Sequence, residues 1–444
     1  MSAGDLYPAL LEVATRRVIE PVIGAPYLTV AQWLRAFERW PDEGRRAWQE
    51  RRLEAVLASA AASVPFYRGL LGRGRRLQFR DLPVVDKALI RGDMLAFRAE
   101  RRGRRSYVQK ATAGTTGDPW QYELDRRAWA HVYGAQLRAW ERVGYRYGDR
   151  IVVLGTPPSL VPGARSVTAR LRAAAERRSY AAAGIAIDPG ASARRVGHAY
   201  EARGVLWYGY AGMVAAMAEA ARPGSWTSQD PAAIVTTSEP LLPEWRRRIE
   251  RAFGAPVVDE YGCNDGGVLA VSCAEGRFHV AENVSLVEIL DGDDPCPPGV
   301  EGDVVVTNLH AEVLPFLRYR VGDRAVLGDG PCPCGLLGLT LARLTGRIGD
   351  RLKLPDGREL QFSTFGPIFW QTPSVRRWQI VQSVRERVKV RLDVDPGFSR
   401  AEADEVRRGM VARVGHGVEV DVVTSEPIER TPAGKQKVLI SSVR

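Results

Sequence analysis

Short apolar runs alternate with helical segments through the middle of the chain, and this alternation limits the folds that the sequence can adopt. The apolar runs DRIVVLGT, VLWYG, AAIVTTS and PVVDEYG cover residues 149–156, 205–209, 232–238 and 256–262. Helical segments such as PEWRRRIERAF lie between them. Strands that alternate with helices are typical of parallel sheets with crossover helices. In such sheets ligands bind beyond the carboxyl ends of the strands, so we expect the functional residues there.

The segments on either side of this region predict further structural units. Residues 1–63 are predicted to form a helical lead-in, because Leu53, Val56 and Leu57 lie at the spacing of a buried helical stripe. Residues 284–326 are rich in β-type runs and predict a small barrel-like sheet. The last hundred residues predict a compact α+β unit, and the pair 349–350 is the expected hinge before it.

The charge of the chain excludes some partners. The 444 residues carry a formal net charge of +11, but the arginines are scattered among glutamates, so we expect no nucleic-acid partner. The densest run, residues 101–105, is either a solvated face or a positive rim that attracts phosphates. No stretch approaches the ~20 apolar residues of a membrane span, and the N-terminus does not resemble a signal peptide. We therefore expect a cytoplasmic protein without a membrane partner.

Lysine is rare in this chain. Six of the 63 basic residues are lysines, at positions 87, 110, 353, 389, 435 and 437. A lysine that persists in an arginine-rich chain can be needed as a compact point charge, which the planar arginine fork does not reproduce. Lys435 is therefore a candidate functional residue, whereas Lys87 is expected to be structural.

A glycine- and threonine-rich segment, TAGTTGDP, spans residues 112–119. Glycine allows backbone angles that turn successive N–H groups toward an anion, and threonine adds hydroxyl donors. The segment lacks the lysine of a P-loop, so an ordinary polar turn is the alternative. The candidate phosphate-binding residues are Thr112, Gly114, Thr115, Thr116 and Gly117.

This segment also resembles the nucleotide loop of adenylate-forming enzymes, specifically the phenylacetate–coenzyme A ligase family. Five more segments resemble that family's motifs in the same order, namely Glu239 in TSEPL, Tyr261 in DEYGCND, Asp323 in RYRVGD, Arg347 in LTGRIGD and Lys435 in RTPAGKQK. The resemblance covers the chain from about residue 64 to its end. It implies an α/β fold with a large N-terminal adenylate-forming domain, residues 1–347, built of doubly wound sheets and a small β-barrel-like sheet. A small mobile α+β lid, residues 348–444, would follow.

The resemblance also implies roles for these residues. The loop would hold the β- and γ-phosphates of ATP, Tyr261 would pack on adenine, and Asp323 would accept hydrogen bonds from the ribose hydroxyls. Arg347 would support that end of the nucleotide, and Lys435 would bridge the substrate carboxylate and the α-phosphate. Coenzyme A would accept the acyl group.

Three positions, Ala113, Asp265 and Gly349, depart from the family pattern. Asp265 stands where the family has a glutamate that helps to place Mg²⁺, and Ala113 stands where it usually has serine. We expect Asp265 to serve at the metal, with Glu239 and a water as the alternative. A locally satisfied polar turn at Asp265 would mean slow adenylation or none.

Three cysteines and a histidine form a second candidate site. Cys273 and His279 are spaced as C-x5-H, and Cys332 and Cys334 form the C-x-C of PCPCG. Three thiols and an imidazole are a tetrahedral Zn²⁺ set, and four protein ligands make a structural site. Free buried thiols are the alternative, and a disulfide is disfavoured in a cytoplasmic protein.

These observations predict an AMP-forming ligase that joins an aromatic acid to coenzyme A. The aromatic WYGY segment adds Tyr208 and Tyr210 as candidate pocket residues, although they could equally fill a core. An amine or a carrier-protein thiol is an alternative acceptor, and a catalytically silent binding protein is the third interpretation. A monomer and a dimer are both compatible with the sequence.

Overall fold

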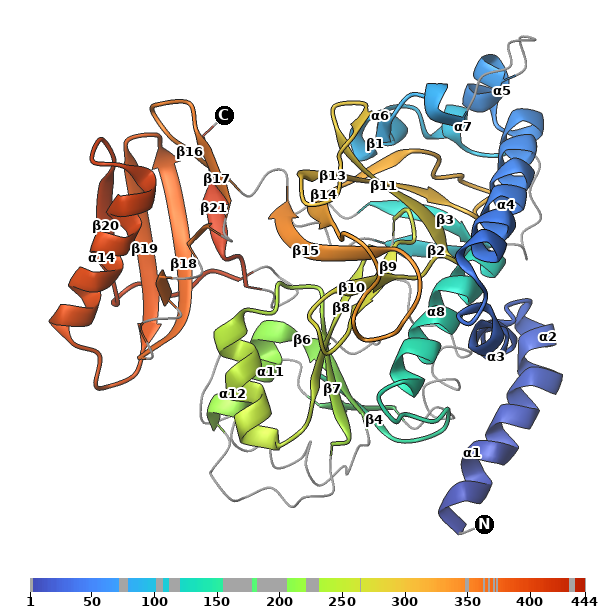
Figure 1. The fold of residues 1–444 in the computed structure, drawn as a ribbon, viewed down its shortest axis with the longest axis horizontal. Helices are drawn as coiled ribbons and strands as arrows, with labels where there is room; N and C mark the ends of the chain where they lie inside the picture. The colour runs from blue at the N-terminus through green and yellow to red at the C-terminus, as the bar shows by residue number, and fades with distance from the viewer. Residues whose placement is uncertain are drawn as a thin grey trace.

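The structure is a computed structural model that combines a large mixed sheet with a smaller C-terminal sheet (Figure 1). It describes residues 3–71, 79–100, 107–111, 120–154, 178–181, 206–220, 231–263, 265–347, 351–361, 364–365, 368–369, 372, 374–430 and 436–443. The expected α/β fold with a small C-terminal α+β unit is confirmed. The exact domain boundary, after residue 347, stays a prediction.

The large sheet has thirteen strands in the order β12-β11-β13-β14-β15-β10-β9-β8-β7-β6-β4-β5, with β1 beside β14. Their bounds are β1 Val85–Asp86, β4 Ile151–Leu154, β5 Arg178–Ala181, β6 Leu206–Tyr210, β7 Ala233–Thr237, β8 Val257–Gly262, β9 Leu269–Ser272, β10 Phe278–Val280, β11 Ser285–Asp291, β12 Asp294–Pro295, β13 Glu301–Asn308, β14 Tyr319–Leu327 and β15 Thr340–Arg347. Strands β5, β4, β6, β7 and β8 are parallel neighbours, and the strands from β8 to β12 pair antiparallel. The expected barrel-like region is thus continuous with the parallel strands.

Helices of the part before residue 347 cover this sheet. They are α1 Ala3–Ala14, the π-helix η1 Thr15–Ile19, α2 Glu20–Ile23, α3 Tyr27–Phe37, α4 Asp42–Ser63, α5 Pro65–Leu71, the 3-10 helix η2 Phe79–Asp81, α6 Lys87–Gly92, α7 Met94–Phe97, α8 Arg126–Glu141, α11 Ala211–Ala220 and α12 Pro243–Phe253. Helices α1 to α4 occupy the predicted helical lead-in. The described helices are too short or too polar to cross a membrane.

Consecutive residues of the parallel strands face two different hydrophobic cores. In β6, Leu206 packs in one core and Trp207 in the other, and in β7 the same alternation separates Ala233 from Ile234. One core includes residues of α3 and α8, and the other includes residues of α11 and α12. Because side chains alternate across a strand, both faces of the sheet are covered, as expected for a doubly wound arrangement.

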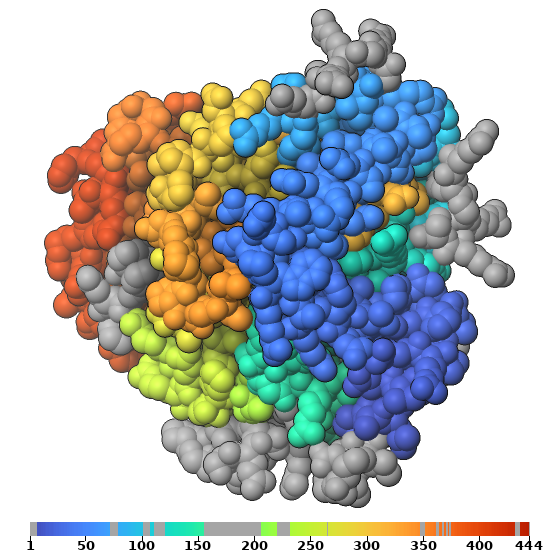
Figure 2. All heavy atoms as spheres, turned by 45° about the vertical axis from the view of Figure 1, so that its right-hand side comes forward, coloured from blue at the N-terminus to red at the C-terminus, as the bar shows by residue number. Residues whose placement is uncertain are grey.

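Helix α4 lies across the antiparallel part of the sheet. Figure 2 shows this blue helix against the orange segment near residue 335. The Arg45 guanidinium donates to Glu282 at 2.8 Å, and Arg52 donates to the Leu309 carbonyl at 3.0 Å. The Glu282 carboxylate in turn accepts the Leu339 N–H at 3.0 Å. These contacts tie the lead-in helices to the loop that contains Cys332 and Cys334.

The C-terminal unit has its own four-stranded sheet, in the order β20-β19-β18-β21 (Figure 1). Its elements are the hairpin β16 Arg351–Lys353 and β17 Glu359–Gln361, then β18 Val375–Val384, β19 Arg387–Val394, α14 Arg400–Val414, β20 Glu419–Val423 and β21 Leu439–Ser441. Ser399 and Glu402 form a capping box that fixes the start of α14. The expected hinge at 349–350 lies outside the described residues.

The C-terminal unit packs against α11 and α12 through one shared apolar cluster. Trp378 stacks on Phe369 at 4.2 Å, and its indole N–H donates to Glu244 of α12 at 3.3 Å. In the other direction, the Trp245 indole donates to the Arg376 carbonyl at 3.4 Å. Two reciprocal tryptophan contacts therefore link this unit to the sheet domain.

The crossing of α3 and α8 depends on Gly134. A Cβ atom at this position would lie 2.6 Å from the Tyr27 carbonyl oxygen and 2.8 Å from Val30 Cγ1. Gly134→Ala should therefore lower the melting temperature, although alanine is favoured over glycine by about 1 kcal/mol in a helix. Gly69→Ala is the matched control, because the exposed Gly69 of α5 has no atom within 4 Å of its added Cβ. Equal melting temperatures for the Gly134 variant and the wild type would contradict this packing.

Candidate functional site

The candidate site lies at the carboxyl ends of the parallel strands. Glu239 follows β7 by two residues, and Tyr261 is the fifth residue of β8. Neighbouring parallel strands end at the same edge of a sheet, so both residues lie at that edge although 22 positions separate them. The sequence-based expectation that functional candidates gather at this edge agrees with their placement.

Glu239 is buried and holds two backbone N–H groups. Its Oε2 accepts the N–H of Gly212 at 2.8 Å, near the start of α11, where the helix dipole favours a negative charge. Its Oε1 accepts the N–H of Gln436 at 2.6 Å, which belongs to the C-terminal unit. Ser238, just before it, has a φ of 68°, which is rare for a residue other than glycine. The chain thus turns sharply to present this carboxylate.

The predicted nucleoside residues lie together. The Tyr261 hydroxyl donates to Asp323 Oδ2 at 2.9 Å, so the expected adenine contact and the expected ribose acceptor are joined. Asp323 is directly opposite Arg347 in the pairing of β14 with β15. Three residues that are far apart in the sequence therefore occupy one end of the site.

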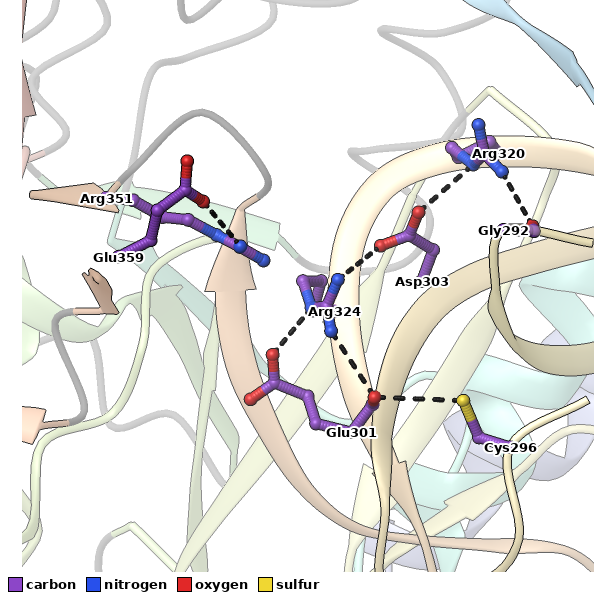
Figure 3. A network of polar contacts seen from close by, with 8 residues as sticks. All are labelled: Gly292, Cys296, Glu301, Asp303, Arg320, Arg324, Arg351 and Glu359. Atoms are coloured by element: carbon purple, nitrogen blue, oxygen red, sulfur yellow. Dashed lines mark hydrogen bonds and ion pairs between the residues drawn. The ribbon is translucent and has the colours of Figure 1, made fainter. Parts of the chain in front are cut away.

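The strand that bears Asp323 is held by a charged network, drawn in Figure 3. Arg324 donates to Glu301 at 2.6 Å and to Asp303 at 2.9 Å, and Arg320 forms an ion pair with Asp303 at 3.2 Å. These contacts join β13 to β14 beside a β-bulge. The same view shows Arg351 paired with Glu359 at 2.8 Å across β16 and β17. The network fixes the backbone from which Asp323 projects.

Asp265 is buried among donors. Its Oδ1 accepts from the Cys263 thiol at 3.1 Å, and its Oδ2 accepts from the Tyr319 hydroxyl at 2.9 Å. Burial, followed by the charge of Asp265, raises the pKa of Tyr319, so the phenol stays protonated and donates. Lys87 Nζ forms an ion pair with Asp265 at 3.8 Å. A carboxylate oxygen has two lone pairs, so Asp265 keeps capacity for a further ligand.

Sequence reasoning missed Lys87, Tyr319 and Trp120 as members of this group. Lys87 Nζ lies 5.3 Å from the centre of the Trp120 ring, within range of a cation–π contact. Trp120 is the first described residue after the predicted phosphate loop. The rarity of lysine was the signal that could have drawn attention to Lys87.

Several predicted residues lie outside the described part of the chain. They are Thr112, Gly114, Thr115, Thr116, Gly117 and Lys435. The described strands on either side of the loop, β2 Tyr107–Ala111 and β3 Gln121–Asp125, pair antiparallel with Ala111 opposite Gln121. The predicted phosphate loop therefore connects the two strands of a hairpin.

The two candidate pocket tyrosines contact different cores. Tyr208 donates to Glu260 at 3.1 Å and lies 5.1 Å from the Trp140 ring, on the side of α8. Burial raises the pKa of Glu260 to about 7, and its donors are neutral. Tyr210 packs against the core of α11 and α12 instead. The structure therefore does not place Tyr208 and Tyr210 against one common cluster.

Cys273, His279, Cys332 and Cys334 converge on one point. Their ligand atoms all lie within 4.8 Å of one another, with 3.7 Å between Cys273 Sγ and Cys332 Sγ and 3.2 Å between Cys334 Sγ and His279 Nε2. Tetrahedral Zn²⁺ with bonds of about 2.3 Å to sulfur places its sulfurs roughly 3.8 Å apart. Burial, together with Arg142 and Arg277, lowers the pKa of His279 to about 4 and keeps the imidazole neutral, as a ligand requires. The donor set therefore fits a zinc ion.

Comparisons with known proteins agree with this architecture. A model of the CapK C-terminal domain matches residues 352–442. A phenylacetate–coenzyme A ligase from Thermus thermophilus is 26% identical over 410 residues, which cover 85% of this chain and 88% of that protein. A phenylacetate–coenzyme A ligase from Pseudomonas putida is 34% identical over 122 residues, 26% of this chain and 27% of that protein.

Solved structures of 2-hydroxyisobutyryl-CoA ligase have the same fold. The postadenylation state, in complex with R3-HIB-AMP, has a TM-score of 0.72 at 21% identity and covers 90% of both chains. The thioesterification state of that ligase, with 2-HIB-AMP and CoA, reaches 0.57 at 23% identity over 90% of both chains. An open conformation reaches 0.55 at 21% identity, over 88% of this chain and 89% of that one. The order of the motifs, the shared fold and these relatives agree with the resemblance: over most of its length this chain is similar to phenylacetate–coenzyme A ligases, and its C-terminal unit is similar to the CapK C-terminal domain.

Proposed function

We propose that this protein is an ATP-dependent ligase that converts a carboxylic acid to an acyl adenylate and transfers the acyl group to coenzyme A. Pyrophosphate leaves in the first half-reaction and AMP in the second. The observation that best supports this proposal is the placement of Glu239 and Tyr261 at one edge of the sheet, where Tyr261 binds Asp323 and Glu239 binds Gln436 of the C-terminal unit. The family relationship supports the same reaction.

In the first half-reaction, a carboxylate oxygen attacks the α-phosphorus of ATP and pyrophosphate leaves. Negative charge must be neutralised as the two anions meet, so fixed cations and N–H donors contribute most. We propose that the loop of residues 112–117 holds the β- and γ-phosphates and that Lys435 lies at the α-phosphate. Tyr261, Asp323 and Arg347 would hold the nucleoside and so orient the α-phosphate for attack.

Mg²⁺ would enter with ATP and neutralise phosphate charge. Asp265 is the proposed carboxylate for it, since among the described residues each of its oxygens accepts one hydrogen bond and a carboxylate oxygen has two lone pairs. The nearby Lys87 ammonium lowers the cost of keeping this carboxylate charged in a buried place. The hydrogen bonds from Tyr319 and Cys263 orient it.

In the second half-reaction, the thiolate sulfur of coenzyme A attacks the acyl carbonyl and AMP leaves. We propose an aromatic acid as substrate, because the aromatic rings of Tyr208 in β6 and Trp140 in α8 lie 5.1 Å apart near the carboxyl end of β6. An amine or a carrier-protein thiol is the alternative acceptor.

A panel of acids tests this proposal. Wild-type protein with ATP and Mg²⁺ should release pyrophosphate with at least one aryl acid, and adding coenzyme A should yield the thioester. Pyrophosphate release followed by product formation only with amines or a carrier protein would favour the alternative acceptor. ATP binding without pyrophosphate release from any acid would identify a silent homologue.

The nucleoside site is tested with Asp323→Ala. A hydrogen bond to a charged group is worth roughly 1.5–3 kcal/mol, so ATP affinity should fall about ten- to a hundred-fold in calorimetric titrations. Tyr261→Phe should have a smaller effect, because it removes only the hydroxyl that donates to Asp323. The control is Asp329→Ala, whose side chain is 84% exposed. An Asp323→Ala affinity equal to that of the wild type would refute the assignment.

We further propose that Cys273, His279, Cys332 and Cys334 bind one structural zinc ion. Metal analysis should find about one zinc per chain, and Cys332→Ser should lose both zinc and thermal stability, because structural zinc contributes to folding. Cys296→Ser is the matched control, since this buried cysteine donates to the Glu301 carbonyl and lies outside the set. Zinc-free protein from a preparation without chelators would overturn the proposal.

A further inference from the structure

Glu239 joins two parts of the chain that meet at the candidate site. Its Oε1 accepts the Gln436 N–H at 2.6 Å, and its Oε2 accepts the Gly212 N–H at 2.8 Å. Gln436 belongs to the C-terminal unit, and Gly212 belongs to α11 of the sheet domain. One buried carboxylate therefore binds the backbone of both parts at once. Hydrogen bonds to an ionised acceptor are about twice as strong as neutral ones.

Gln436 is itself fixed within the C-terminal unit. Its side-chain amide donates to the Trp378 carbonyl at 2.9 Å, and its backbone forms an antiparallel bridge with Arg430. The next residue, Lys437, is held through its carbonyl by the Gln379 amide at 2.8 Å. A hydrogen bond to the Gln436 N–H therefore restrains the C-terminal unit as a whole and not only a flexible segment of it.

The position of this contact in the sequence is informative. The N–H of Gln436 belongs to the peptide unit that joins residue 435 to residue 436, so Glu239 holds the backbone immediately after Lys435. The tryptophan contacts across the same interface, from Trp245 and Trp378, are longer, at 3.4 and 3.3 Å. The charged contact at Glu239 is thus the shortest of the three, and its N–H donor, Gln436, follows Lys435 directly in the sequence.

The arrangement of the two parts matches one functional state of a structural relative. The postadenylation state of 2-hydroxyisobutyryl-CoA ligase has a TM-score of 0.72, whereas its thioesterification and open states have 0.57 and 0.55. These values concern one enzyme, so their difference reflects how its parts are placed. The Glu239–Gln436 contact accordingly belongs to an arrangement like that of the postadenylation state.

We propose that Glu239 is a positioning residue that holds the C-terminal unit in place for adenylation and has no comparable task in thioester formation. Its carboxylate fixes the peptide after Lys435 and so determines where that lysine can act. This inference rests on the proposed function. It assigns to Glu239 a role different from the magnesium role considered from the sequence, because its two oxygens bind backbone N–H groups.

Separate assays of the two half-reactions test the proposal. Glu239→Ala should slow acyl-AMP formation roughly ten- to a hundred-fold, because it removes the charge-assisted contact, and should leave thioester formation from pre-made acyl-AMP within about two-fold of the wild type. Lys435→Ala provides the reference pattern, a loss confined to the first half-reaction. A change in Mg²⁺ dependence is not expected.

Two further variants make the test specific. Gly212→Ala keeps the charge but places a Cβ atom 2.9 Å from Glu239 Oε2, so it should displace the carboxylate and give the same pattern more weakly. Glu244→Gln is the matched control, because Glu244 contacts Trp378 at the same interface but not the segment beside Lys435. It should change neither half-reaction by more than about two-fold.

Hydrogen–deuterium exchange gives a readout that does not depend on activity. Glu239→Ala should increase exchange in a peptide that spans residues 436–441 and leave β19 unchanged, whereas general destabilisation would affect both. Equal slowing of both half-reactions, slowing of neither, or unchanged exchange at 436–441 overturns the proposal. A wild-type protein that forms no acyl-AMP from any acid refutes the proposed function instead, and the exchange experiment still decides whether Glu239 holds the C-terminal unit.

Discussion

The covering of both faces of the parallel strands is the constraint on which the rest of the structure depends. Leu206 and Trp207 are neighbours in β6, yet Leu206 packs on the side of α8 and Trp207 packs on the side of α12. With both faces largely covered by apolar packing, the ends of the strands are the main open positions for polar groups. Glu239 and Tyr261 lie at those ends, and the C-terminal unit packs beside them on α11 and α12. Packing of the sheet thus decides where chemistry can occur.

Buried carboxylates at this edge are stabilised in different ways. Glu239 is held by two backbone N–H groups, one of them near a helix N-terminus. Asp265 has two neutral donors and a lysine, whereas Glu260 has only neutral donors, and burial raises its pKa to about 7. A charged carboxylate needs compensation when it leaves water, so these surroundings determine which of the three suits a cationic ligand. By this criterion Asp265, which has Lys87 beside it, is easier to keep charged than Glu260, whose donors are all neutral.

The interface between the sheet domain and the C-terminal unit combines apolar packing with few short polar contacts. Phe369 and Trp378 stack within the C-terminal unit, and Trp378 reaches Glu244 across the interface. Around these contacts, apolar residues of both parts belong to one shared cluster. The carboxylate of Glu239 adds a directional bond to this packing, and a directional bond is lost when the parts rotate.

The sequence by itself determined the fold class and supplied the candidate site residues, whose roles stay predictions. Local patterns were enough to predict these, because strands, crossover helices and the Cys/His spacing each leave a signal within a short segment. Only the tertiary structure placed Lys87 and Tyr319 beside Asp265, put Tyr208 and Tyr210 against different cores, and joined Glu239 to Gln436. These contacts link residues that are distant in the chain, and no local pattern encodes their distances. They arise from how the sheet, its helices and the C-terminal unit pack together.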